Sequence, residues 1–538
     1  MMGLKQRIVD RSKQALLTPS VLRWVTDDRV MKATEGLMDA RTRVRDAWKV
    51  LLNGNELPNI DPALDENIGE SLASAGVSEV NGKANGHAHT NGASNGASNG
   101  AAAKTNGASN GSRVELVDRE GSTDMAESMK ERTSLASIGG KDVFEKAFKF
   151  MAADNARKMG IYPYFRPLDF ADGPEAQING KRVVMFGSNN YLGLTTHPKV
   201  REAAKAAIDR FGTSMTGSRL VNGSMKLHEE FEEKLAHFFQ KESALVFTTG
   251  YQVNIATCAA LLSNKQSVAV IDRNVHASLY DGVRLGQAAG ARLVRYRHND
   301  AESLDKALEK LDAGDGAFVL TDGVFSAEGE IAKLDELVPV VKKHGARLFV
   351  DDAHALGVIG PEGKGTAAHF GLLDQVDLVG GTFSKSMASI GGWLVGDRKV
   401  LDYIRHFAPS FMFAAAAAPP SVAAAMAAFD VMREEPWRIT KLSENFTYMR
   451  DELTKMGFEL GHTQTAVIPI YIRQDLRTIM MWRDLLEDYG IYTNPFISPG
   501  VPPKSAMLRT SYMATHDRHH LDRALEGFQK VGKKYGVI

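Results

Sequence analysis

Short β-rich runs alternate with helical stretches between residues 268 and 380, and this alternation limits the possible folds more than any other feature of the chain. Helical patterns over 301–311 and 334–344 lie between these runs, and turn-forming residues bound them. Strands that alternate with helices in this way pair in parallel and are covered by the helices. We therefore expect an α/β fold with a mostly parallel sheet. Its predicted strands lie at 268–271, 293–296, 318–320, 348–350 and 378–380.

The flanking regions predict further units. Past residue 420 the pattern becomes helix, strand, helix, strand, helix, which indicates a smaller α+β domain. Before the sheet, residues 142–158 have the pattern of one amphipathic helix. The expected organisation is a helical extension, a flexible linker, an N-terminal helix and arm, a large domain and a small C-terminal domain. Their predicted bounds are 1–55, 56–120, 121–190, 191–420 and 421–538.

The extension and the linker have distinct compositions. Asn-Gly occurs seven times between Asn81 and Gly111 without alternating apolar flanks, which indicates a flexible linker rather than hairpin turns. Residues 1–55 hold eleven Lys/Arg and six Asp/Glu, whereas 56–80 hold six acids and no base. A seven-residue repeat predicts a narrow helical seam with a helical partner, or alternatively a solvated helix that packs on its own protein. The repeat consists of Val30, Leu37, Val44 and Leu51, with Ala33, Ala40 and Ala47.

Charge and cysteine content exclude several classes of function. Lys plus Arg and Asp plus Glu both number 65, so the chain has no overall field that favours nucleic acid or a membrane. The single cysteine, Cys258, lies in an apolar stretch and is expected to be a buried, inert thiol. Charged residues interrupt the first turns of the N-terminus, and the longest apolar stretch, 411–418, is too short to span a membrane. We expect a soluble cytoplasmic protein without a metal site, with attachment to the inner membrane surface as the alternative.

Polar residues that directly follow the predicted strands are the candidates for chemistry, because ligands of open α/β sheets bind beyond the carboxyl ends of strands. Asp351 and His354 follow the run at 348–350, and Lys385 follows the run at 378–380. His276 follows the run at 268–271. Taken singly, such residues are often helix caps, solvated turns or core histidines. A lysine among small residues at a strand end is nevertheless suited to Schiff-base chemistry.

Eight ordered motifs in residues 145–538 resemble the α-oxoamine synthases, a family of enzymes of fold type I that depend on pyridoxal 5'-phosphate (PLP). The resemblance implies a PLP-dependent transferase fold with a seven-stranded sheet in the large domain. The motifs are SNNYLGL (188–194), TGSRLVNG (216–223), FTTGYQVN (247–254), HASLYDG (276–282), DGVFSAEG (322–329), DDAHALGVIG (351–360), GTFSKS (381–386) and LRTS (508–511).

The resemblance also implies roles for the residues that contact the cofactor ring. Lys385 is expected to hold PLP covalently and to move the proton at the α-carbon of the amino acid. Asp351 is expected to pair with the pyridine nitrogen and keep it protonated. His276 is expected to stack on the ring. His354 is expected to reach the phenolic oxygen or the carbonyl region, with Ser326 as its neighbour.

Other residues are assigned to the phosphate and the substrate. The backbone amides of Gly250 and Tyr251 open a predicted helix and suit the phosphate, with the Thr382 hydroxyl as a further donor. Arg509 is the candidate for the substrate carboxylate, because its planar fork gives a bidentate fit. Asn189, with Asn190 as the alternative, is expected to line the substrate side.

The implied reaction is a decarboxylating condensation of a small amino acid with an acyl thioester, giving an α-amino ketone. The motifs are most similar to those of bacterial serine palmitoyltransferases, so serine and a long-chain acyl-CoA are favoured, and a homodimer is implied. Two positions depart from that subfamily: Ile497 stands where it has arginine, and Ala415 where it has a hydroxyl residue. Glycine or alanine as substrate, an acyl carrier protein as donor, an aminotransferase and a non-catalytic scaffold subunit are the alternatives.

Overall fold

The computed structural model describes residues 141–538; the predicted extension, the whole predicted linker and residues 121–140 of the predicted arm lie outside them. The single helix predicted over 142–158 is wrong: two short helices, α7 (Glu145–Phe148) and α8 (Ala152–Lys158), occupy this segment. No residue of either helix is buried. Helices this short depend on packing for stability, and residues 149–151 are exposed, so burial does not stabilise a continuous helix here.

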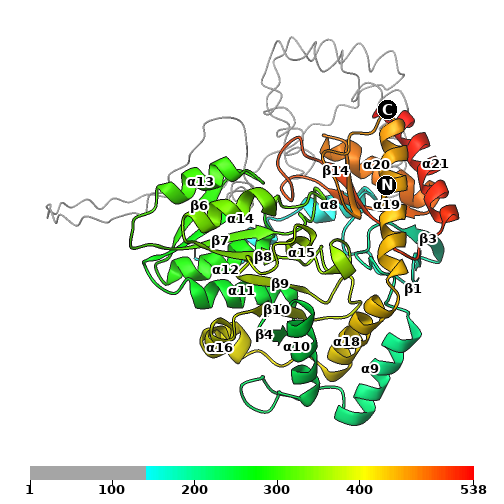
Figure 1. The fold of residues 1–538 in the computed structure, drawn as a ribbon. Helices are drawn as coiled ribbons and strands as arrows, with labels where there is room; N and C mark the ends of the chain where they lie inside the picture. Colours follow the sequence, from blue (N-terminus) through cyan, green and yellow to red (C-terminus); the bar gives the residue numbers. More distant parts are fainter. Residues whose placement is uncertain (1–140) are drawn as a thin grey trace, which may run out of the picture. The chain divides into compact units, whose positions relative to one another are not determined.

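A seven-stranded sheet forms the centre of the large domain and confirms the predicted α/β class (Figure 1). Its order is β4-β10-β9-β8-β7-β5-β6. Strand β10 runs antiparallel to both of its neighbours, β4 and β9, and thus opposite to the rest of the sheet. The five predicted strands are present, each one or more residues longer than the predicted run. The strands are β4 (Ser243–Phe247), β5 (Ser267–Asp272), β6 (Arg292–Tyr296), β7 (Gly316–Asp322), β8 (Arg347–Asp351), β9 (Leu378–Thr382) and β10 (Gly392–Gly396).

Helices surround this sheet and bury it (Figure 1). Every residue of β5, β9 and β10 is buried, as expected for strands covered on both faces. Cys258 is also fully buried, as expected, and burial raises the pKa of its thiol. The helices of this domain are α9 (Pro198–Phe211), α10 (Lys226–Phe238), α11 (Gly250–Leu261), α12 (Ala277–Ala288), α13 (Ala301–Glu309), α14 (Leu334–Lys343), α15 (Thr366–His369), α16 (Arg398–Phe407), α17 (Pro409–Met412) and α18 (Pro419–Glu434).

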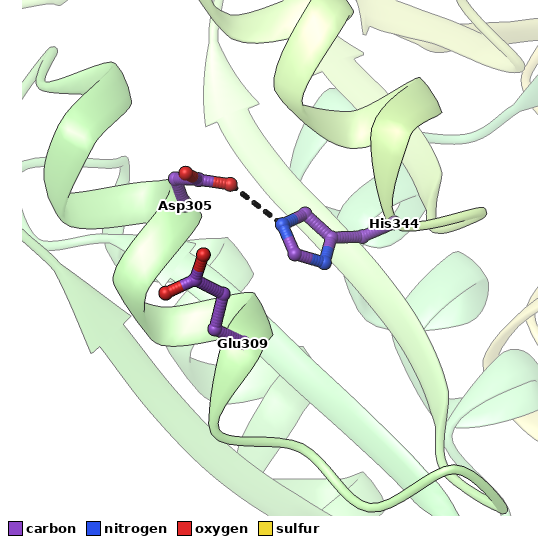
Figure 2. A group of neighbouring side chains, drawn as sticks. All are labelled: Asp305, Glu309 and His344. Carbon is purple, nitrogen blue, oxygen red and sulfur yellow. Dashed lines mark hydrogen bonds and ion pairs between the residues drawn. The ribbon is translucent and has the colours of Figure 1, made fainter.

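A charged group joins α13 to the end of α14 (Figure 2). Asp305 accepts a hydrogen bond from Nε2 of His344 at 2.6 Å and from Nζ of Lys343 at 2.8 Å. Glu309 lies one turn further along α13, and its carboxylate is 3.6 Å from the same Lys343 ammonium. Lys343 thus supplies the positive charge that faces both carboxylates. We therefore assign this group to helix packing and not to a metal.

The C-terminal part, for which the sequence predicts a smaller α+β domain, contains helices and further strands. Its three-stranded antiparallel sheet has the order β11-β14-β13. A separate sheet has the order β1-β2-β3-β12, so strands of the predicted arm pair with a C-terminal strand. The elements are β1 (Phe170–Asp172), β2 (Glu175–Ile178), β3 (Lys181–Met185), α19 (Trp437–Lys455), β11 (Val467–Tyr471), α20 (Asp475–Tyr489), β12 (Ile491–Tyr492), β13 (Asn494–Phe496), β14 (Met507–Ser511) and α21 (Arg518–Lys534).

No helix in residues 141–538 combines the length and the apolar character that crossing a membrane requires.

Candidate active site

A cavity of about 310 Å³ lies beyond the carboxyl ends of the central strands. Asp351 ends β8, Asp322 ends the neighbouring β7, and the two are paired in register. Lys385 follows β9 on the other side of β8. Parallel strands direct their carboxyl ends to one edge, so residues far apart in the sequence meet there. The cavity lining includes seven of the predicted site residues: Gly250, Tyr251, His276, Asp351, His354, Thr382 and Lys385.

Lys385 lies in the turn between β9 and β10 and faces this cavity. Burial is the main reason why the pKa of its ammonium is lowered to about 8; the Asp351 carboxylate opposes this effect and the Arg509 charge adds to it. A pKa near 8 leaves a useful fraction of the amine unprotonated at neutral pH. Lys385 is therefore suited to nucleophilic attack on an aldehyde.

Asp351 is held by two hydrogen bonds. Its Oδ2 accepts from Nδ2 of Asn254, on α11, at 2.6 Å, and its Oδ1 accepts from the backbone amide of Ala353 at 3.0 Å. The second proton of the same Asn254 amide is donated to Oγ of Ser278 at 2.8 Å. The carboxylate is thus fixed in orientation at the base of the cavity. Asn254 lies in the FTTGYQVN motif, but its contact with Asp351 joins residues 97 positions apart and was not predicted.

His276 caps the first turn of α12 and lines the cavity. Its Nδ1 lies 2.7 Å from Oγ of Ser278, the hydroxyl that also contacts Asn254. Burial lowers the pKa of His276, so the imidazole is neutral at pH 7. Its backbone amide donates to Asp322 at 3.2 Å. Burial and the nearby Asp351 carboxylate raise the pKa of Asp322 well above its usual range. Ser278 and Asp322 are site residues that the sequence did not predict.

Arg509, on β14, forms a second group with residues of the loop after β3. Its Nη2 donates to Oδ1 of Asn189 at 3.0 Å, and its Nε donates to the carbonyl of Ser326 at 2.7 Å. The side chain of Asn190 instead bonds within its own loop, to Thr195 and to the amide of Leu194. The geometry thus brings Asn189 and Ser326 to the candidate carboxylate-binding arginine and leaves Asn190 in a structural contact.

His354 connects the residues that line the cavity to the loop after β3, which contacts Arg509. It lines the cavity with Lys385, and its Nδ1 lies 2.7 Å from the hydroxyl of Tyr191, which is fully buried. Burial lowers the pKa of His354 well below its ordinary value, and the charges of Lys385 and Arg509 lower it further. His354 is therefore neutral and presents one donor and one acceptor nitrogen.

The start of α11 suits a phosphate group. Thr249 caps the helix by accepting from the amide of Gln252 at 3.1 Å, and Gly250 and Tyr251 open the first turn. A Cβ atom at Gly250 would lie 2.5 Å from Cβ of Thr382, so only glycine allows this close approach. Amides in the first turn of a helix lack intrahelical acceptors and attract anions. The Thr382 hydroxyl, which contacts Oγ of Ser384 at 2.8 Å, adds a polar group.

These features together fit PLP. The cavity volume lies within the usual range for small-molecule sites, about 300–1,000 Å³. It combines an amine for the aldehyde, a carboxylate for the ring nitrogen and a helix start for the phosphate.

Comparisons with known proteins agree with this chemistry. A model of the family described as aminotransferase class I and II matches residues 181–528. Serine palmitoyltransferase from Sphingobacterium spiritivorum is 42% identical over 390 residues, which is 72% of this chain and 96% of that relative. An 8-amino-7-oxononanoate synthase from Thermoanaerobacter pseudethanolicus is 37% identical over 386 residues, 72% of this chain and 96% of that relative.

A solved structure is also similar. It is described as a high-resolution structure of SPT with PLP internal aldimine, and it aligns with a TM-score of 0.71 and 35% sequence identity. The alignment covers 74% of this chain and all of the solved one.

Proposed function

The chain belongs to the α-oxoamine synthases within the class I and II aminotransferase family, and we propose that it condenses serine with a long-chain acyl-CoA. It is an acyltransferase with PLP as its cofactor. The products proposed are carbon dioxide, free CoA and an α-amino ketone of the 3-keto sphingoid base type, an intermediate of sphingolipid synthesis. The observation that carries the proposal is the single cavity that Lys385, Asp351, His276 and His354 share.

The residues divide the work of this reaction. PLP, when bound, withdraws electrons from the bonds at the α-carbon of the amino acid. Asp351 would hold its ring nitrogen protonated, since a fixed negative charge favours the cationic form. Lys385 would hold the cofactor until the amino acid takes the place of the lysine, and the freed amine of Lys385 would then carry the α-proton. His276 would pack on the ring, and Gly250, Tyr251 and Thr382 would hold the phosphate.

Arg509 is proposed to bind the carboxylate of the amino acid, with Asn189 beside it. Its replacement by alanine is expected to raise the amino-acid KM by about 10- to 100-fold, because a hydrogen bond to a charged group contributes roughly 1.5–3 kcal/mol. The absorbance of the lysine-bound cofactor is expected to stay intact. Steady-state kinetics with varied serine measure the effect. Arg473→Ala, which removes an arginine paired with Glu459, is the control; an unchanged KM in Arg509→Ala would assign the carboxylate to another residue.

The choice of serine is tested by titrating the PLP-loaded protein with serine, glycine and alanine in turn. We expect the absorbance of the lysine-bound cofactor to change at the lowest concentration for serine. Thioesters of several chain lengths, on CoA or on an acyl carrier protein, then identify the donor. A preference for glycine or alanine would support a reaction of the ketobutyrate ligase or oxononanoate synthase type, which Ile497 and Ala415 leave open.

The scaffold alternative requires no working site. A subunit without catalytic activity has no need to keep Lys385, Asp351 and His276 together, and all three line this cavity. We further propose that the enzyme is a homodimer located in the cytoplasm. Sedimentation of the active enzyme tests the dimer, and an active monomer would contradict it.

Residues 1–112 are proposed to recruit a partner and to be dispensable for chemistry. The Asn-Gly-rich composition predicts a flexible linker of about thirty residues, and such a linker would span roughly 30 Å, enough for the extension to act away from the catalytic part. The narrow Val/Leu and Ala seam favours a helical protein partner over an anionic membrane surface, which would need a broader apolar face.

Removal of this segment tests the proposal. A variant that starts at Gly121 is expected to turn over serine and a free acyl-CoA within about threefold of the full-length rate, since no assigned site residue lies before Asn189. The PLP absorbance of both proteins is the control for cofactor binding. Loss of activity or of PLP binding would instead make the segment part of the catalytic fold.

A further inference from the structure

The hydroxyl of Tyr191 has no role in the mechanism described above, yet it makes one of the shortest polar contacts at the site. Tyr191 is fully buried in the loop after β3, and its hydroxyl lies 2.7 Å from Nδ1 of His354. His354 lines the cavity, whereas Tyr191 does not. Tyr191 can therefore act on the cofactor side only through His354, as a positioning residue.

The surrounding contacts decide which partner donates the proton. Tyr191 has two neighbours that can accept, Nδ1 of His354 at 2.7 Å and Oδ1 of Asn189 at 3.3 Å. The Asn189 oxygen already accepts from Arg509 at 3.0 Å. The positive charge of Arg509 also acts on the phenol oxygen, where it lowers the pKa of Tyr191 against the larger effect of burial, which raises it. A phenol proton is repelled by this cation and directed toward His354.

We propose that Tyr191 donates its proton to Nδ1 of His354 and so fixes this residue as the neutral Nε2–H tautomer, with Nε2–H as a donor into the cofactor cavity. A neutral imidazole has one donor nitrogen and one acceptor nitrogen. If the tyrosine hydroxyl donates to Nδ1, then Nδ1 is the acceptor and the ring proton is on Nε2. The group that Nε2–H meets, the phenolic oxygen of PLP, rests on the proposed function. Replacement of the tyrosine hydroxyl would release the histidine to either tautomer.

The tautomer is measured directly by ¹⁵N NMR of the full-length, PLP-loaded protein with labelled histidine. His354→Gln identifies the His354 signals by their loss. We expect Nδ1 of His354 to have the shift of an unprotonated nitrogen and Nε2 that of a protonated one. A protonated Nδ1 in the wild-type protein would overturn the proposal. This result does not depend on the identity of the substrate, so it is distinguishable from a failure of the proposed reaction.

Tyr191→Phe tests the consequence for catalysis. We expect both His354 tautomers to appear and kcat to fall about tenfold, the effect of losing one well-formed hydrogen bond, while the serine KM stays within about twofold. The matched control is Tyr512→Phe, since Tyr512 is equally buried and its hydroxyl contacts Oγ1 of Thr510 at 3.0 Å, outside the cavity. If Tyr191→Phe and Tyr512→Phe show the same His354 tautomer and the same kcat, the proposal is wrong. If Tyr191→Phe does not fold, the wild-type spectrum alone decides.

Discussion

Replacement of Lys385 by alanine is expected to give a folded protein without covalently bound PLP and without measurable turnover. Burial disfavours the charged ammonium of Lys385, whose pKa is lowered to about 8, so we expect its removal to leave the protein folded. A positioned acid or base alone contributes about 10²–10⁴-fold to a rate. Loss of the covalent attachment adds to this, so we expect a decrease of at least about 10³-fold. Absorbance spectroscopy and release of CoA measure the two effects.

Lys241→Ala is the matched control for this variant. Burial also lowers the pKa of Lys241, but its Nζ donates to the carbonyl of Val376 at 2.7 Å and it does not line the cavity. We expect normal PLP binding and a rate within about twofold of wild type. Activity close to wild type in Lys385→Ala would refute the assignment of the covalent attachment and of the proton transfer to Lys385.

Replacement of Asp351 by asparagine is expected to leave PLP bound and to lower the rate by about 10³-fold or more, which corresponds to roughly 4 kcal/mol of transition-state stabilisation. The neutral amide has nearly the same shape as the carboxylate. It no longer supplies the charge that keeps the ring nitrogen protonated, so the cofactor withdraws electrons less strongly. Single-turnover measurements with serine separate this slow proton transfer from binding.

The neighbouring Asp352→Asn provides the control. Asp352 is fully buried and accepts the amide of Thr366 at 2.9 Å, but it does not line the cavity. Burial raises the pKa of Asp352 to about 7, so its surroundings disfavour the charged form, and asparagine is neutral. We expect the turnover rate of Asp352→Asn to stay within a few-fold of that of the wild-type enzyme. Full activity in Asp351→Asn would mean that another group sets the protonation of the ring.

The strands that the sequence predicts correctly are those whose apolar runs are followed by polar residues. β5, β6, β7, β8 and β9 belong to this class, and the ends of all but β6 carry or lead into the candidate site. The sequence does not separate β4 and β10 from buried helix segments, because both are short and continuously apolar, without an alternating pattern. The antiparallel position of β10 follows from pairing with β4 and β9, a property of the tertiary structure.

The individual site residues were predictable where a motif assigns them a role. The links between them were not, because Asn254 contacts Asp351 across 97 positions and Tyr191 contacts His354 across 163. Each of these residues also has an ordinary interpretation, as a buried helix or loop residue. Only the contact geometry shows that one amide orients the carboxylate and that one phenol faces the histidine.

The proposed condensation releases the serine carboxylate as carbon dioxide and frees CoA, and one measurement follows both products together. Serine labelled at the carboxyl carbon and a long-chain acyl-CoA are incubated with the PLP-loaded enzyme, and labelled carbon dioxide and free CoA thiol are quantified. We predict equal amounts of the two products, formed only when both substrates are present and absent in Lys385→Ala. CoA release without labelled carbon dioxide, amino-group transfer to a keto acid, or no release of either product would contradict the account.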